Sequence, residues 1–304
     1  MNSTYDELLK VPLADLIKQA DEERRSHHVE MDICTITNAK SGLCSEDCKF
    51  CAQSLHHSTK IDAYPLKPIK IMLDEARLAK KNGAERFCIV TSGNVLSDED
   101  FATVAETITQ LWDSVGIDAD ASLGRLSKER LKTLKDAGLT RYHHNIETSR
   151  NFYPSIITTH TFDERLATLK AAKEAGLEIC SGGIIGLGET WEDRIDMALT
   201  LKELDVDSVP INILNPIKGT PLENAERLSP LDAIRTIAIF RIILPGKTIK
   251  IAAGRETILK DYQAMCFAAG ANGMLIGGYL TMKGRPVEED QKFIREIEEL
   301  WENG

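Results

Sequence analysis

The sequence alternates between short runs rich in β-branched residues and longer amphipathic stretches. The expected strands are Met31–Asn38, Arg86–Ser92, Asp118–Leu123, Arg141–Thr148, Glu178–Ile185, Ser208–Asn215, Thr248–Ala253 and Met274–Tyr279. The expected helices between them are Leu66–Asn82, Asp98–Ser114, Ser127–Ala137, Thr161–Ala175, Trp191–Leu204, Leu231–Ile243 and Arg255–Ala268. This order predicts an α/β fold, a (β/α)8 TIM-type barrel, which typically takes about 250 residues.

The rest of the chain is expected to form helical extensions at both ends of the barrel. These are an N-terminal helix over Tyr5–Arg25 and a C-terminal helix over Glu288–Trp301. No linker or low-complexity tract interrupts the pattern, so residues 1–304 are expected to form a single domain. An open doubly wound sheet and a partial barrel of six strands remain alternatives, because sequence does not show closure.

The charge composition argues against some classes of binding partner. Lys and Arg number 37 against 47 Asp and Glu, which gives a formal net charge of −10 and argues against nucleic acid or an anionic membrane. No apolar run reaches transmembrane length, and the polar, acidic first residues are unlike a signal peptide. Seven cysteines, an odd number, favour metal ligation in a reducing compartment over a secreted disulfide framework. We therefore expect a cytoplasmic protein.

Three of the cysteines crowd into eight residues directly after the first expected strand. Cys44, Cys48 and Cys51 have the spacing C-x3-C-x2-C. A 4Fe–4S cluster held by three thiolates leaves one iron open to bind a small molecule. A zinc knuckle or three unrelated thiols are the alternatives, but no second cysteine pair or His-x3–5-His follows at zinc spacing. In a barrel, this loop lies at the mouth where the chemistry occurs.

The cysteine spacing resembles that of the radical S-adenosylmethionine enzymes. In that superfamily the open iron binds S-adenosylmethionine, and electron transfer cleaves it to methionine and a 5′-deoxyadenosyl radical. The resemblance implies that Phe50 lies against the adenine. The stretch Gly182–Glu189 fits the superfamily pattern G-x-I-x-G-x-x-E, which implies that Gly182, Ile184 and Gly186 also approach the adenine. A tight turn is the simpler explanation of such glycines.

Longer motifs, in register from Cys34 to Glu288, resemble the biotin synthases. The matching strings are Cys44–Ser54, Asn145–Ser149, Cys180–Thr190, Val209–Asn212, Lys218–Pro221, Gly254–Glu256 and Gln263–Cys266. Members of that family insert sulfur into dethiobiotin. Their sulfur comes from an auxiliary iron–sulfur cluster, normally 2Fe–2S, held by three cysteines and an arginine.

The auxiliary ligands are only partly present in this chain. By position in the motifs, Cys88 and Cys180 match two of the family cysteines and Arg255 matches the arginine. The position of the remaining cysteine is Asp120. The resemblance therefore implies an auxiliary cluster but leaves its type open, 2Fe–2S or a variant.

Cys34, in the first expected strand, offers a replacement thiol. Barrel strands alternate inward and outward side chains, so inward residues of neighbouring strands can share a site. Cys34 is thus expected to join the two matching cysteines, although an inert buried thiol is the alternative. A carboxylate suits cluster iron less well than a thiolate, so Asp120 is expected to pair with Arg86 or Arg255.

Polar residues near the ends of the fourth and sixth strands carry the rest of the expected site. Asn145 and Glu147 are two apart and therefore face the same side of a strand. The resemblance implies that Asn145 and Asn212 contact the substrate and that Glu147 binds the ribose of S-adenosylmethionine. His143 and His144 are more simply read as satisfied histidines at a strand end than as ligands.

The motifs together favour a sulfur-inserting enzyme that converts dethiobiotin to biotin. A radical maturase of the iron-only hydrogenase, a methylornithine-synthase-like barrel and a non-catalytic iron–sulfur scaffold are the alternatives. The expected cofactors are a 4Fe–4S cluster, S-adenosylmethionine and the auxiliary cluster. The resemblance further implies a one-electron donor such as flavodoxin or ferredoxin, iron–sulfur assembly proteins as partners, and a homodimer.

Overall fold

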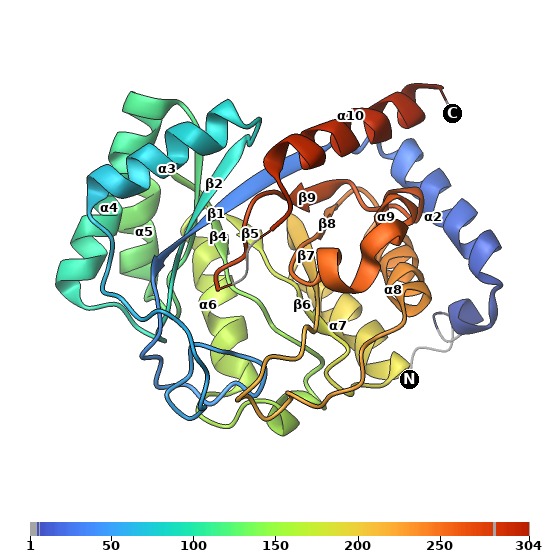
Figure 1. Cartoon of the computed structure of the whole chain (residues 1–304), viewed down its shortest axis with the longest axis horizontal. Coiled ribbons are helices and arrows are strands. Elements are labelled where there is room, and N and C mark those ends of the chain that lie inside the picture. The colour runs from blue at the N-terminus through green and yellow to red at the C-terminus, as the bar shows by residue number, and fades with distance from the viewer. Residues whose placement is uncertain (1–4, 6, 282–283, 304) are drawn as a thin grey trace.

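The strands form one closed parallel barrel (Figure 1). The computed structural model describes residues 5, 7–281 and 284–303. The strands within this range are β1 (Asp32–Lys40), β2 (Arg86–Thr91), β3 (Asp118–Ser122), β4 (Leu139–His143), β5 (Glu178–Cys180), β6 (Gly183–Ile185), β7 (Ser208–Ile213), β8 (Thr248–Ile251) and β9 (Gly273–Leu275). They pair in the order β5-β4-β3-β2-β1-β9-β8-β7-β6, and a contact of β5 with β7 closes the ring. Because β5 and β6 are two halves of one barrel strand, the predicted eight-stranded barrel is confirmed.

Helices surround the barrel and connect its strands (Figure 1). They are α3 (Ile69–Lys81), α4 (Asp98–Val115), α5 (Lys128–Asp136), α6 (Phe162–Glu174), α7 (Trp191–Glu203), α8 (Pro230–Ile243) and α9 (Gln263–Ala268). The extensions are η1 (Glu7–Lys10) and α2 (Leu13–Ser26) at the N-terminal side and α10 (Val287–Asn303) at the other. A short 3-10 turn, η2 (Tyr153–Ser155), precedes α6. Among the described residues, no helix combines the length and apolar character needed to cross a membrane.

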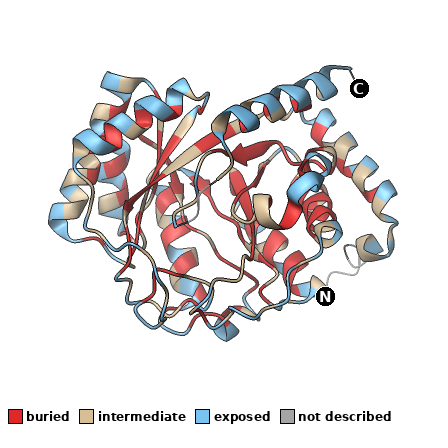
Figure 2. Ribbon diagram, in the orientation of Figure 1, coloured by how far each residue is buried: buried red, intermediate tan, exposed pale blue. Residues whose placement is uncertain are grey.

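Local signals explain where the outer helices begin. The hydroxyls of Ser97 and Ser127 accept hydrogen bonds from the first turns of α4 and α5. Thr161 and Thr190 form capping boxes at the starts of α6 and α7. The helices turn apolar faces toward the strands, so burial concentrates at the barrel wall while outer helix faces stay exposed (Figure 2).

The fifth barrel strand is interrupted, which the sequence pattern does not predict. The expected strand Glu178–Ile185 appears as β5 and β6, because the facing strand β7 carries Pro210 at this height. Proline has no N–H to donate to a neighbouring strand. The carbonyl of Gly182 instead accepts hydrogen bonds from the backbone N–H groups of Ile146 and Glu147, on the other side.

Two further elements differ from expectation. The expected strand Arg141–Thr148 ends early, at His143, and the chain then turns through Glu147, whose φ is +69°. The expected helix Arg255–Ala268 is broken into a π-helical turn η3 (Arg255–Leu259), a 3-10 turn η4 (Lys260–Tyr262) and α9. Both departures occur where the chain leaves a strand end and lines the barrel mouth.

Candidate active site

A cavity of about 370 Å3 occupies the barrel mouth, and two groups of cysteines line it. The first group, here called the loop thiols, consists of Cys44, Cys48 and Cys51. The second group, here called the barrel thiols, consists of Cys34 on β1, Cys88 on β2 and Cys180 on β5. All six are free of disulfides. The structure therefore brings both predicted sets of metal ligands to one cavity.

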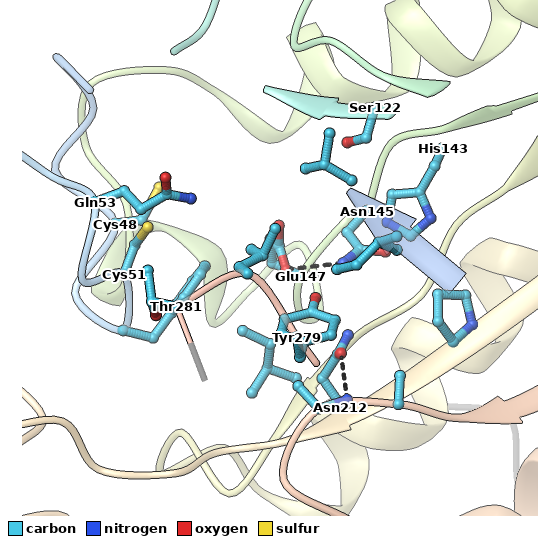
Figure 3. A pocket seen from close by; sticks show the side chains of 18 of the residues that line it. Cys48, Cys51, Gln53, Ser122, His143, Asn145, Glu147, Asn212, Tyr279 and Thr281 are labelled. Atoms are coloured by element: carbon cyan, nitrogen blue, oxygen red, sulfur yellow. Dashed lines mark hydrogen bonds between the residues drawn. The ribbon is translucent and has the colours of Figure 1, made fainter. Parts of the chain in front are cut away.

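The loop thiols are fixed by backbone hydrogen bonds within their own loop. The N–H of Cys44 donates to the carbonyl of Gln53 at 3.0 Å, and that of Cys51 donates to the carbonyl of Cys48 at 2.9 Å. The loop is tied to the segment before α6 by the pair of Glu46 with His160, at 2.5 Å. Figure 3 shows Cys48 and Cys51 together at one end of the cavity. The positions of the three cysteines therefore depend on backbone hydrogen bonds and on the Glu46–His160 pair.

Burial disfavours the charged form of two of these thiols, Cys48 and Cys51. It raises the pKa of Cys51 to about 11 and raises that of Cys48 further, and Glu147 adds to both effects. Among the described residues, no three His, Cys, Asp or Glu side chains converge on one metal ion. A 4Fe–4S cluster suits this spacing, because each of its thiolates binds a separate iron.

The barrel thiols come from three strands and lie deeper. Burial is the main cause that raises the pKa of Cys88, and the neighbouring charges of Asp120, Cys180 and Cys34 raise it further. Burial likewise raises the pKa of Cys34 to about 11, and the charges of Asp120 and Cys180 are among the causes that raise it. The structure thus brings Cys34 to the two cysteines that match the family, as the inward alternation of strands predicts.

Asp120 lines this cavity but forms an ion pair with an arginine. Its Oδ1 atom lies 3.1 Å from Nη1 of Arg86, and both side chains are nearly buried. Burial raises the pKa of Asp120, against the lowering effect of Arg141 and Arg86. The predicted pairing of Asp120 with Arg86 is confirmed.

Arg255 is not brought to the barrel thiols, which corrects the assignment made from its motif. It is almost completely buried but does not line the cavity. Its Nη2 lies 2.5 Å from Oδ2 of Asp290 on α10, and its Nη1 donates to Gln263 at 2.8 Å. A buried guanidinium requires such partners, and here they hold it against the C-terminal helix.

The cation that does line the cavity beside the barrel thiols is Lys250, which the sequence analysis missed. Lys250 lies on β8, and its Nζ is 2.6 Å from Oδ1 of Asp32. Burial alone would lower the pKa of Lys250, but the charges of Cys34, Asp32 and Cys180 raise it above its ordinary value. The available signal was a single lysine in the otherwise apolar strand end Ile249–Ala252.

The predicted substrate and cofactor residues of the strand ends also line the cavity. These residues are Phe50, Asn145, Glu147, Ile184 and Asn212. The Oδ1 of Asn145 accepts from the N–H of Gly182 at 3.1 Å, and the amide of Asn212 donates to the Gly183 carbonyl at 3.1 Å. Figure 3 shows Asn145, Glu147 and Asn212 facing the space between the thiols and the barrel wall.

Glu147 is held in an uncommon conformation by a buried arginine. Its φ of +69° is rare for a residue with a long side chain. Arg165 on α6 lies 3.4 Å from the Glu147 carboxylate and also donates to the Asn145 carbonyl at 2.8 Å. Burial raises the pKa of Glu147 although Arg165 opposes it. The arrangement aims one carboxylate into a dry cavity.

Two predicted cofactor contacts are not found on the cavity wall. Gly182 and Gly186 lie outside its lining, unlike Ile184 between them. A Cβ on Gly182 would lie 2.0 Å from the Pro210 carbonyl oxygen, so this glycine serves close packing of strands. The N–H of Gly186 donates to Glu189 at 2.8 Å, in a tight turn.

Two further cavity residues were not assigned a role from the sequence. Burial raises the pKa of Tyr279, after β9, and the charges of Glu147 and of cysteines from both thiol groups raise it further. Figure 3 shows Tyr279 between Glu147 and Asn212. His143 lies with its Nδ1 3.3 Å from the sulfur of Cys180, and burial lowers the pKa of His143 to about 4. A tyrosine in a loop and a histidine at a strand end carry no distinguishing sequence signal.

Comparison with known families agrees with this arrangement. Residues 40–201 match the Radical SAM superfamily, and residues 210–298 match the Biotin and Thiamin Synthesis associated domain. Among solved structures, methylornithine synthase matches with a TM-score of 0.83 at 19% identity, covering 99% of this chain and 92% of that one. The hydrogenase maturase HydG matches with a TM-score of 0.75 at 17% identity, over 89% and 63% of the two chains. At such identities these two show the fold alone.

Much higher identity links the chain to curated relatives. The biotin synthase of Thermotoga petrophila is 50% identical over 97% of this chain and 98% of its own length. The biotin synthases of Thermotoga neapolitana, at 53% over 89% and 97%, and of Pelotomaculum thermopropionicum, at 50% over 90% and 85%, agree. The chain belongs to the biotin synthase family of radical S-adenosylmethionine enzymes.

Proposed function

We propose that this protein converts dethiobiotin to biotin by inserting sulfur at two alkyl carbons. The observation that carries the proposal is the pair of thiol groups facing one cavity, one on the mouth loop and one in the barrel wall. A substrate between them would be reached by a radical from one side and by sulfur from the other. The curated relatives of similar length and about half identity carry the name of this activity.

The loop thiols fit the 4Fe–4S cluster that the family implies, and the cavity beside them fits S-adenosylmethionine. When bound, these two groups supply a 5′-deoxyadenosyl radical. Phe50 and Ile184 offer apolar surface for an adenine beside the loop. The carboxylate of Glu147, oriented by Arg165, can accept hydrogen bonds from both ribose hydroxyls.

The substrate would be oriented by amides and enclosed by apolar surface. The amide oxygen of Asn145 accepts from the N–H of Gly182, and Asn212 has both amide atoms bonded to backbone, so both amide planes are fixed on the cavity wall. A preset hydrogen-bonding group orders a ligand at low entropic cost. The buried wall also excludes water, which protects a radical from side reactions.

The barrel thiols would hold the auxiliary cluster that supplies sulfur. Cys34, Cys88 and Cys180 are the three thiolates that the structure offers, and Asp120 is paired with Arg86. Three thiols is also the number that the family's ordinary 2Fe–2S cluster uses, so the proposed cluster is 2Fe–2S or a variant of it, with Cys34 on β1 in place of a ligand at Asp120 on β3. Arg255 has no part in this proposal, because Asp290 holds it elsewhere.

Partners and location follow from the chemistry. Reductive cleavage needs a one-electron donor, for which flavodoxin or ferredoxin is suitable, and consumed sulfide requires iron–sulfur assembly proteins. Free cysteines throughout the chain suit a reducing compartment, which supports the cytoplasm. A homodimer is proposed from the family resemblance.

The proposal is tested by anaerobic reconstitution and product analysis. With reductant and S-adenosylmethionine, biotin and 5′-deoxyadenosine should form when dethiobiotin is present. A maturase or a methylornithine-synthase-like barrel would form 5′-deoxyadenosine without responding to dethiobiotin, and a scaffold would form none. Either result would overturn the proposed activity.

A further inference from the structure

Lys250 is a buried cation placed among thiols. Only 3% of its surface is exposed, and it lines the cavity together with the three barrel thiols and Asp120. Buried lysines are rare unless they are paired, because removing an ammonium from water is costly. Its position on β8 faces the interior of the barrel and lies within electrostatic reach of Cys34 and Cys180.

A glycine on the neighbouring strand makes room for the Lys250 side chain. Gly273 on β9 is its partner in the strand register. A Cβ at position 273 would lie 2.7 Å from Cγ of Lys250 and 3.4 Å from its Cδ. The first of these distances is too short for real atoms, so any larger residue would displace the stem. The missing side chain at position 273 therefore leaves the space that the Lys250 stem occupies.

The ammonium has one partner and donors to spare. Oδ1 of Asp32, two residues before Cys34 on β1, lies 2.6 Å from its Nζ in an ion pair. Asp32 is shared with Arg141, whose Nη1 lies 3.2 Å away. A lysine ammonium has three N–H donors. The ion pair with Asp32 does not use all three, which leaves donors for Cys34 and Cys180 on the wall of the same cavity.

The other charged groups around this site are largely matched to one another. Arg86 pairs with Asp120, and Arg141 pairs with Glu178 at 2.9 Å as well as with Asp32. His143 touches Cys180, with its Nδ1 3.3 Å from the sulfur. Lys250 is thus the cation most available to anionic sulfur in the barrel.

We propose that Lys250 is the positioning residue of the auxiliary site, where its ammonium donates hydrogen bonds to the thiolate and sulfide sulfurs of the cluster. This rests on the proposed function, because it needs the barrel thiols to hold a cluster. A protonated ammonium has no lone pair, so Lys250 does not bind iron. Hydrogen bonds to cluster sulfur instead stabilise the negative charge there and set the reduction potential.

The test counts the auxiliary cluster alone. A full-length protein in which Cys44, Cys48 and Cys51 are replaced with Ala is reconstituted with iron and sulfide, and both are measured per chain. In that protein, Lys250→Met should make retention of iron against a chelator about tenfold weaker, the scale of losses at groups that support metal ligands. Its midpoint potential should fall, because a positive donor is removed. Lys250→Arg should restore both.

Two further variants guard against loss of folding. Lys250→Met leaves Asp32 with Arg141 as its nearest cation, so the double variant Lys250→Met with Asp32→Asn removes one charge of each sign, and circular dichroism checks both. Lys247→Met, at a surface pair with Asp205, is the matched control and should behave like the parent.

The outcomes separate the two proposals. Parental iron, sulfide and potential in the folded double variant would overturn the role of Lys250 and leave the auxiliary site standing. If the protein lacking loop thiols bound no cluster, the auxiliary site and the role of Lys250 would both be wrong. Biotin formation by the unaltered protein tests the activity itself and does not depend on Lys250.

Discussion

At the scale of single residues, the question is whether Cys34 or Asp120 supplies the third ligand of the auxiliary cluster. Cys34 lines the cavity with Cys88 and Cys180, whereas Asp120 is engaged by Arg86. Cys34→Ser should therefore remove the auxiliary iron and sulfide, while Asp120→Ala should mostly spare them. Iron and sulfide counts after reconstitution decide between them. Loss in Asp120→Ala with parental counts in Cys34→Ser would show that the carboxylate is the ligand.

A buried histidine should make the fold sensitive to acid. Burial, with Arg165 nearby, lowers the pKa of His144 well below its ordinary value, and its Nε2 is buried without a hydrogen-bond partner in the described structure. Below about pH 6.5, His144 binds a proton in the unfolded chain but not in the folded one. The free energy of unfolding therefore decreases as pH falls, by up to about 1.4 kcal/mol per pH unit.

His144→Phe isolates this effect, because it keeps a ring against Tyr142 but cannot titrate. Urea unfolding midpoints of parent and variant are compared between about pH 7 and about pH 5.5. The parent should lose stability more steeply than the variant. Equal slopes would show that His144 is protonated as readily in the folded protein as in the unfolded chain.

Residue identity alone does not distinguish Arg255 from Lys250, and this is where sequence reasoning fails. The two lie five positions apart, one in η3 and the other on β8. Which of them faces the thiols depends on where the strand ends and on Asp290, some 35 residues further along the chain. By contrast, the loop thiols are predictable, because all three lie in one short segment whose spacing is fixed locally.

At the scale of elements, the C-terminal helix is attached to the barrel by a buried ion pair. Asp290 on α10 is completely buried and contacts both Arg255 and Arg285. Asp290→Asn should destabilise the fold by about 3 to 5 kcal/mol, since it removes the buried carboxylate that faces a buried guanidinium and leaves Arg255 with the more exposed Glu256. Glu256→Gln, which alters the more exposed partner of Arg255 at 3.1 Å, is the control and should cost much less.

The same pair of variants tests the correction of Arg255. Chemical unfolding gives the stability of each, and iron counting gives the auxiliary cluster. Because Asp290 acts on the helix contact, folded Asp290→Asn protein should keep its auxiliary iron. A stable variant that loses this iron would return Arg255 to the auxiliary site.

The interruption between β5 and β6 should tolerate no side chain. In Gly182→Ala the new Cβ would meet the Pro210 carbonyl oxygen at 2.0 Å and shift the backbone that supports Glu147. Stability and S-adenosylmethionine affinity should both fall. Gly138→Ala, where a Cβ meets nothing within 4 Å but φ is +105°, isolates the cost of left-handed backbone and should spare affinity.

Parental S-adenosylmethionine binding in Gly182→Ala, measured by equilibrium dialysis, would separate the strand break from the site. The sequence predicts this strand only as one continuous run, since Pro210 is distant in sequence and its effect acts across the ladder. Alternation of apolar runs with amphipathic helices predicts where the other strands lie, because the barrel buries nearly every one of them. The strands expected at Arg141–Thr148 and Met274–Tyr279 end earlier, at His143 and Leu275.

For the whole molecule, the two thiol groups should have separable roles. Cys48→Ala should abolish formation of 5′-deoxyadenosine, because the open cluster loses a ligand. Cys88→Ala should leave S-adenosylmethionine cleavage intact while biotin formation stops. Chromatographic assay of both products in each variant checks this. Biotin formed at the parental rate by Cys88→Ala would show that the barrel thiols are not the source of sulfur.

The origins of the two groups along the chain also fix an order of assembly. The loop thiols span eight residues, so a partly folded chain can already present them together. The barrel thiols come together only when β1, β2 and β5 are part of the sheet. The second neighbour of β1 is β9, near the end of the chain. The deeper group is therefore complete only after more of the chain has folded than the loop requires, and a cluster delivered to it would enter through the cavity at the barrel mouth.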